Sequence, residues 1–271
     1  MLWWQPNNSI QMGTTMPNAL DQSFMNKVPL VTLYFWIIKI LATTVGETGA
    51  DFLNFNLGFG LTKTSLLAAV ILMGFLALQM RQARYVPWIY WMTVVFLSIV
   101  GTLITDSLSD TFRVSLYVSS AIFAGGLTIT FIAWYRGEHT LSIHDITTPR
   151  REAYYWAAIL FTFALGTAAG DLVSEKLGLG YILAGVIFGG FIALMAIGFY
   201  AKILNPVFAF WSAYVLTRPF GASLGDFLTQ AHKDGGLGFS TMPVSGVFLV
   251  VIIAMVAYLT VRGADREQVS A

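Results

Sequence analysis

Eight apolar stretches, each near the length of a membrane-spanning helix, follow one another along the 271-residue chain. A helix needs about 20 apolar residues to cross the hydrocarbon core of a bilayer. Composition agrees, because 56% of the residues are hydrophobic and only 11% are charged, whereas a soluble domain carries about 25% charged residues. The sequence therefore predicts an all-α integral membrane protein, a bundle of eight transmembrane helices. The expected spans are residues 28–54, 62–80, 86–108, 115–135, 153–174, 180–201, 205–228 and 242–261.

Basic residues are distributed unevenly between the two ends of these predicted helices. Nine lie at the chain ends or in the even-numbered connections, and four lie in the odd-numbered connections. The positive-inside rule then places both termini in the cytoplasm. Residues 1–27 are a polar cytoplasmic segment without the basic and apolar regions of a signal peptide, residues 28–262 are the transmembrane domain, and residues 263–271 are a cytoplasmic tail.

A fourfold internal repeat, W-x9-G-x4-D, runs through the chain. Glycine stands ten residues and aspartate fifteen residues after each of four tryptophans. Each repeat contains two predicted helices, so all four have the same orientation and are related about an axis along the membrane normal. We expect a pseudo-fourfold or two-plus-two bundle with repeats at about 28–82, 83–137, 148–202 and 203–262. The motif residues are Trp36, Trp91, Trp156 and Trp211, then Gly46, Gly101, Gly166 and Gly221, then Asp51, Asp106, Asp171 and Asp226.

Four tandem two-helix repeats with a signature tryptophan resemble a family of bacterial integral membrane proteins that is catalogued only as a repeat of unknown function. The resemblance covers residues 28–262. It implies eight helices and a location in the bacterial inner membrane, and it carries no established activity.

The tryptophans and glycines of the motif have structural interpretations. Tryptophan close to cytoplasmic charges is typical of the aromatic belt at the membrane surface, so we interpret it as an anchor. The glycines lie deeper, where they either allow close helix packing or mark helix breaks that expose backbone carbonyls, as in transporters with discontinuous helices. Pro219, two residues before Gly221, favours a disturbed helix in repeat four, and both interpretations can hold together.

The aspartates predict the functional site. An acid within a spanning helix costs several kcal/mol unless it is paired or hydrated, so by default it faces the bundle interior or a water-filled path. The alternative is that all four aspartates cap helices at the outer surface. In three repeats a second acid lies four residues away on the same helix face, so one acid of each pair holds a proton or the pair binds a cation. These pairs are Glu47 with Asp51, Asp106 with Asp110, and Asp171 with Glu175; repeat four has Asp226 with Gln230.

Two basic residues fall inside predicted helices. Lys39 precedes Glu47 by eight residues, and Arg218 precedes Asp226 by the same interval. A base buried in a membrane requires an acid partner. We expect each base either to form a permanent ion pair or to compete with a transported cation for a carboxylate, which would couple binding to a conformational step.

The available ligand chemistry favours hard cations. The chain has no cysteine, and carboxylate and hydroxyl oxygens suit Mg²⁺, Ca²⁺, Mn²⁺ or protons better than Zn²⁺ or Cu⁺. The leading hypothesis is a secondary transporter or exporter of a small hard cation, preferably divalent, with proton coupling left open. The alternatives are a proton-coupled transporter of a small organic solute and a cation-selective channel lined by a ring of aspartates. The expected cation ligands are Glu47, Asp51, Asp106, Asp171 and Asp226.

Other function classes lack support in the sequence. No nucleotide-binding fingerprint or nucleophile motif occurs, so we expect neither enzymatic activity nor a bound cofactor. The basic residues form no patch that would bind nucleic acid. The expected partners are the lipid bilayer, a small cation and protons, and a homo-oligomer is compatible with the sequence.

Overall fold

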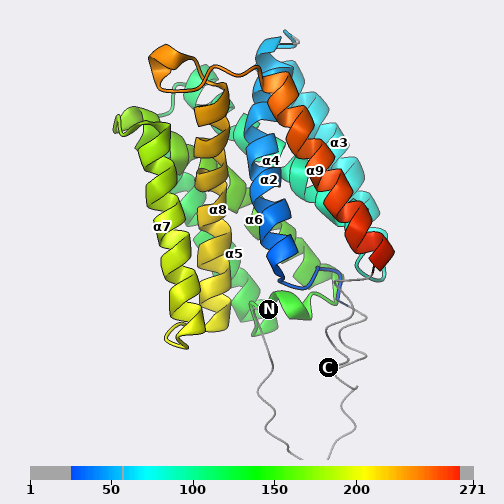
Figure 1. Cartoon of the computed structure of the whole chain (residues 1–271). Helices are drawn as coiled ribbons and strands as arrows, with labels where there is room; N and C mark the ends of the chain where they lie inside the picture. The colour runs from blue at the N-terminus through cyan, green and yellow to red at the C-terminus, as the bar shows by residue number, and fades with distance from the viewer. Residues whose placement is uncertain (1–25, 57, 263–271) are drawn as a thin grey trace, which may run out of the picture.

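The computed structural model describes residues 26–56 and 58–262, and this part of the chain contains helices and no strands (Figure 1). The predicted N-terminal segment up to residue 25 and the predicted tail at 263–271 lie outside the described residues. The eight long helices are α2 (Leu33–Asp51), α3 (Leu61–Arg81), α4 (Pro87–Asp106), α5 (Leu116–Glu138), α6 (Pro149–Asp171), α7 (Gly180–Tyr200), α8 (Pro206–Thr229) and α9 (Thr241–Arg262).

The four helices that carry the repeated motif form a closed inner ring. Helix α2 packs against α4 and α8, and α6 packs against the same two helices. Each remaining helix packs chiefly against the motif helix of the following repeat: α3 on α4, α5 on α6, α7 on α8, and α9 on α2 (Figure 1). The two helices of a repeat are therefore not a tight hairpin, and α9 closes the circle by returning to the first repeat.

The outer helices bury one narrow stripe each. In α9 the buried residues are Ile252, Val256 and Leu259, spaced so that they share one face. The rest of α9 exposes large apolar side chains such as Val247 and Val250. A helix that is apolar on every side but packs on only one side has further apolar faces that suit contact with lipid.

Six of the eight helices are long and apolar enough to cross a membrane, which indicates a multi-pass membrane protein. The two that fall short are α2 and α8, and both belong to the inner ring. They carry the buried charged residues Lys39, Glu47, Arg218 and Asp226. Because other helices surround an inner helix, its polar side chains can face protein rather than hydrocarbon.

Local signals place the helix ends. Proline occupies the first turn of α4, α6 and α8, where its missing N–H costs nothing. At the opposite end, Gly58 and Gly60 after α2 have φ of 65° and 73°, and Gly178 and Gly180 after α6 have φ of 68° and 74°. The paired glycines that repeats one and three share therefore build the same left-handed turn into the next helix.

Candidate functional site at the centre of the ring

The motif glycines lie at the contacts between neighbouring inner helices. A Cβ atom at Gly101 would lie 2.7 Å from the Cβ of Phe163 on α6, and one at Gly221 would lie 2.7 Å from the Cβ of Thr43 on α2. Gly46 faces Ser98 on α4 in the same way, at 2.5 Å from its Cβ. In every repeat the glycine meets the residue seven positions after the tryptophan of the next repeat, and the fourth contact, Gly166 against Arg218, continues this circular pattern.

Close packing, rather than a helix break, is thus what the glycines provide. Helices α2, α4, α6 and α8 all pass through their motif glycines without interruption. The sequence predicted that Pro219 disturbs the helix of repeat four. This prediction is wrong, because α8 continues as an α-helix through Pro219. Its ring instead packs on repeat three, where a Cβ at Gly166 would lie 2.9 Å from the Pro219 Cδ.

The four signature tryptophans are buried, so the prediction that they anchor the protein at the membrane surface is wrong. Each tryptophan contacts the aromatic residue that precedes the tryptophan of the previous repeat, with ring centroids 5.4–6.1 Å apart. These contacts between repeats are tilted, and the two rings within each repeat meet edge to face, so eight aromatic rings close one end of the inner ring. The contacts are Phe35 with Trp91, Tyr90 with Trp156, Tyr155 with Trp211, and Phe210 with Trp36.

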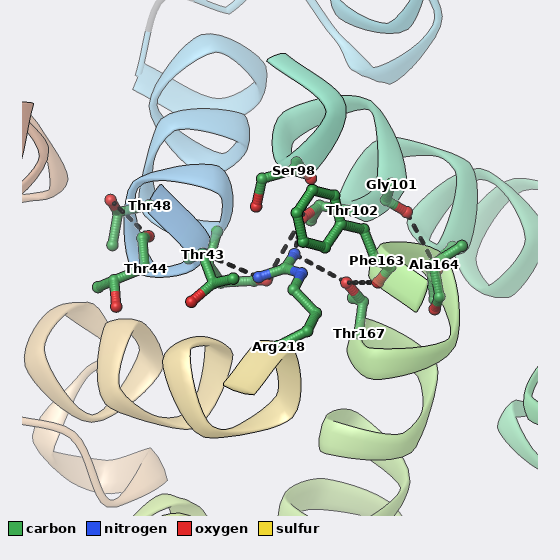
Figure 2. A network of polar contacts seen from close by, with 12 residues as sticks. Thr43, Thr44, Thr48, Ser98, Gly101, Thr102, Phe163, Ala164, Thr167 and Arg218 are labelled. Carbon is green, nitrogen blue, oxygen red and sulfur yellow. Dashed lines mark hydrogen bonds and ion pairs between the residues drawn. The ribbon is translucent and has the colours of Figure 1, made fainter. Parts of the chain in front are cut away.

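The guanidinium of Arg218 occupies the centre of the inner ring. Figure 2 shows it reaching from α8 between the three other motif helices. Its Nη2 lies 2.9 Å from Glu47 Oε2 and donates to the hydroxyls of Thr102 and Thr167, the latter at 2.8 Å. Its Nη1 donates to the carbonyl of Thr43 at 2.8 Å. One arginine, fully buried, thereby joins all three other repeats.

The contacts of Arg218 follow the internal symmetry. Glu47, Thr102 and Thr167 each stand eleven residues after their tryptophan, so the ring places them at one level. Arg218 stands seven residues after its own tryptophan and reaches up by one helical turn. The equivalent position on α8, eleven residues after Trp211, is Ala222. Its small side chain leaves space at this level for the guanidinium of Arg218, which belongs to the same helix.

Lys39 lies deep in the same ring without the acid partner that the sequence predicts. It is fully buried, and its Nζ donates to the Thr217 hydroxyl at 3.2 Å. The same atom lies 4.4 Å from the ring centroid of Phe163 and 4.2 Å from that of Tyr214. Within the described residues no carboxylate forms an ion pair with Lys39. The expectation that each buried base pairs with an acid is therefore met by Arg218, which pairs with Glu47 across the ring, and not by Lys39, which lies over two aromatic faces.

The motif aspartates lie near the opposite end of the inner ring from the aromatic contacts. Asp51, Asp106 and Asp171 are the last α-helical residues of their helices, and each is partly exposed. Asp226 lies within α8 and is buried. Glu47 is close enough to interact electrostatically with all four. The aspartates thus share one region above the Arg218 level.

A π-helical turn follows the aspartate directly in three repeats, at Phe52–Asn56, Ser107–Thr111 and Leu172–Lys176. Such turns are rare and frequently occur at functional sites. Asp110 and Glu175, the second acids of the predicted pairs, lie in these turns and are exposed. Tyr181 donates to Glu175 at 3.3 Å, and neither acid joins an ion pair among the described residues.

The described residues contain no group of three or more acids and histidines that could hold a metal ion. The acids that the sequence marks as metal ligands therefore surround one region without forming a preorganised metal site.

A second buried ion pair, which the sequence analysis did not predict, lies near the aromatic end. Lys27 Nζ is 2.6 Å from Glu152 Oε2, and both side chains are almost fully buried. The carboxylate also accepts from Gln79 and from the indole of Trp156, at 3.1 and 3.4 Å. Lys27 belongs to the stretch predicted to be a polar cytoplasmic segment, and its contacts with Glu152 and with the Met80 carbonyl tie the end of that stretch to α6 and α3.

Comparison with known proteins identifies the family. Residues 34–85, 89–140, 154–202 and 209–265 each match the family model described as Repeat of Unknown Function (DUF347). The four matches follow the four repeats and cover most of the chain, so the protein belongs to this family. No curated protein and no solved structure matches the chain.

Proposed function

We propose that this member of the DUF347 repeat family is a secondary transporter of a small cation, with its path along the axis of the inner ring. In this proposal all eight helices cross the bacterial inner membrane, the repeats share one orientation, and both termini are cytoplasmic. Support comes from the closed circle of α2, α4, α6 and α8. Because α4 and α6 meet the length and hydropathy of a span, the α2 and α8 helices that complete their ring are expected to cross with them.

The Arg218–Glu47 ion pair carries the proposal. Burying two charges costs several kcal/mol per ion, and apolar residues of similar volume are often as stabilising. Ionisable residues inside a membrane bundle therefore indicate function by default. The guanidinium is paired with Glu47, a carboxylate that lies one helical turn before Asp51 on α2. A cation that enters past the aspartates must compete with Arg218 for Glu47, and this competition would couple binding to movement of α8 against α2.

Two observations bear on the alternatives. Eight aromatic side chains in mutual contact close the end of the helix ring that lies opposite the aspartates. This favours a transporter with alternating access over a continuously open channel. The absence of a three-ligand metal group among the described residues favours the second candidate, a proton-coupled transporter of a small organic solute, over a carrier with a preformed metal site.

Flux measurements test the proposal. Purified protein in proteoliposomes is offered Mn²⁺, Mg²⁺, Ca²⁺, Na⁺ and small organic cations, with and without an imposed proton gradient. Wild type should move at least one of these cations, and Asp106→Asn, Asp171→Asn and Glu47→Gln should each abolish that movement. Accumulation against a gradient identifies a transporter, whereas fast dissipative flux identifies a channel.

Asp234→Asn is the matched control, because Asp234 lies in the 3-10 turn between α8 and α9 and is solvent-exposed. It removes the same charge outside the ring and should leave flux unchanged. Normal flux in the Asp106, Asp171 and Glu47 variants would remove the acids from the mechanism.

A further inference from the structure

The groups around Arg218 make a site suited to a guanidinium. The cage consists of one carboxylate from Glu47, one backbone carbonyl from Thr43, and the hydroxyls of Thr102 and Thr167. A guanidinium is planar with five N–H donors and no acceptor, so a cage of oxygen acceptors with a single negative charge matches it in both charge and hydrogen bonding. The Arg218 Nε has no partner among the described residues.

One level nearer the aromatic end, a second cation lies in a different cage. The Lys39 ammonium rests over the faces of Phe163 and Tyr214 and donates to Thr217. Two aromatic faces and a hydroxyl are typical of organic ammonium recognition. The Tyr214 hydroxyl is fully buried and has no hydrogen-bond partner among the described residues, so the cage keeps an unused acceptor.

Neither cage suits a hard divalent ion. Ca²⁺ takes six to eight oxygen ligands and Mg²⁺ takes an octahedron in which carboxylates and waters dominate. The Arg218 cage has one carboxylate, and the Lys39 cage has none among the described residues. Both cages instead fit cations that carry N–H donors.

We infer that the substrate is a small organic cation with a guanidinium or primary ammonium head, which takes the places that the Arg218 and Lys39 side chains fill in this conformation. The inference rests on the proposed transport function and narrows its substrate class. In this scheme the two tethered side chains act as internal substitutes for the substrate: they neutralise Glu47 and cover the aromatic faces when no substrate is bound.

Uptake of radiolabelled guanidinium and propylammonium into proteoliposomes, measured beside Mn²⁺ and Mg²⁺, tests the inference. Wild type should take up at least one organic cation saturably. Thr102→Val removes a cage hydroxyl and Phe163→Leu removes an aromatic face. Each should raise the half-saturating concentration about tenfold, as expected for the loss of one contact to a charged group.

Matched controls lie outside the cages. Thr93 is on the same helix as Thr102 and is equally buried, and its hydroxyl donates only to the Ile89 carbonyl of its own helix. Phe96 stacks on Phe75, away from Lys39. Thr93→Val and Phe96→Leu should keep the wild-type half-saturating concentration.

The outcomes separate the inference from the function on which it rests. Uptake of Mn²⁺ or Mg²⁺ that excess guanidinium and propylammonium leave unchanged would overturn the substrate class and keep the transporter. Absence of flux for every cation would overturn both. Equal effects of the cage variants and their controls would also contradict the assigned cages.

A binding measurement gives a readout independent of flux. Arg218→Ala empties the first cage, so millimolar guanidinium chloride should raise the thermal unfolding midpoint of this variant relative to the same concentration of sodium chloride. Wild type, whose cage is filled, should show no such difference. A folded Arg218→Ala protein that guanidinium does not stabilise would count against the cage.

Discussion

Substitution of Gly46 by alanine tests whether close approach of the inner helices holds the ring together. An added Cβ would collide with the Ser98 Oγ, its nearest neighbour, and would lie 2.5 Å from the Ser98 Cβ and 3.0 Å from the Ser98 carbonyl carbon. Ordinary van der Waals contact begins near 3.4 Å. The Oγ can rotate away, but the Cβ and the carbonyl carbon cannot, so α2 and α4 must separate by about 1 Å. In a closed ring this separation also disturbs the neighbouring contacts.

Two opposing contributions set the magnitude. Forced overpacking in a well-packed interior costs about 1–3 kcal/mol, while alanine is favoured over glycine within a helix by about 1 kcal/mol. Because the clash involves backbone and Cβ atoms, we expect the cost near its upper limit. Gly46→Ala should therefore destabilise the protein by about 1–2 kcal/mol net.

The assay is the unfolding midpoint of the detergent-solubilised protein, with Gly74→Ala as the control. Gly74 lies in the middle of α3, and nothing would lie within 4 Å of an added Cβ, so this variant should equal or exceed wild-type stability. Ser98→Gly in the Gly46→Ala background removes the contacted Cβ and should restore most of the loss. A Gly46→Ala midpoint at or above that of wild type would refute the packing role of the glycines.

Three further predictions concern charged and titratable groups. Arg218→Met leaves Glu47 buried without its partner and should destabilise the protein by about 3–5 kcal/mol. In denaturant or thermal unfolding, the double variant Arg218→Met with Glu47→Leu should recover most of that loss. A double variant as unstable as the single one would contradict the pairing. Lys27→Met should loosen the contact between α3 and α6, so limited proteolysis near Arg81 should quicken, and the exposed substitution Lys202→Met should leave cleavage unchanged. Burial lowers the pKa of His144 below its ordinary value of 6.5. The unfolded state therefore binds the proton first, and the stability of the fold should decrease as the pH drops below about 6.5. His144→Gln should flatten this decrease, and an unchanged slope would exclude His144 as its cause.

The helices and repeats could be predicted from the sequence because their signals are local. Apolar runs of the right length predicted eight helices, and the described structure has eight long helices with bounds mostly within a few residues of the predicted spans. The four matches to the family model agree with the W-x9-G-x4-D register. The glycines were correctly assigned to close packing as one of two interpretations, since small residues spaced along a membrane helix favour close approach.

The partners of the buried charges could not be predicted in the same way. The sequence indicated that Lys39 and Arg218 each require an acid partner, but it does not show which helices are neighbours. Closure of the ring brings α8 against α2 and lets Arg218 reach Glu47. The signal was present in the repeat register, because Glu47, Thr102 and Thr167 occupy equivalent positions, yet it has meaning only once the four helices are known to surround one axis.

The burial of the tryptophans has the same origin. A tryptophan near the charged residues of a connection looks the same in sequence whether it faces lipid or a neighbouring helix, and here each one packs against the previous repeat in the ring. The sequence alone determined a helical membrane protein of four equivalent units, because length, hydropathy and repetition are properties of the chain itself. Only the tertiary structure decided that the units close into a ring, that aromatic side chains seal one end, and that a single arginine joins the four units at the centre, because these depend on contacts between helices far apart in the chain.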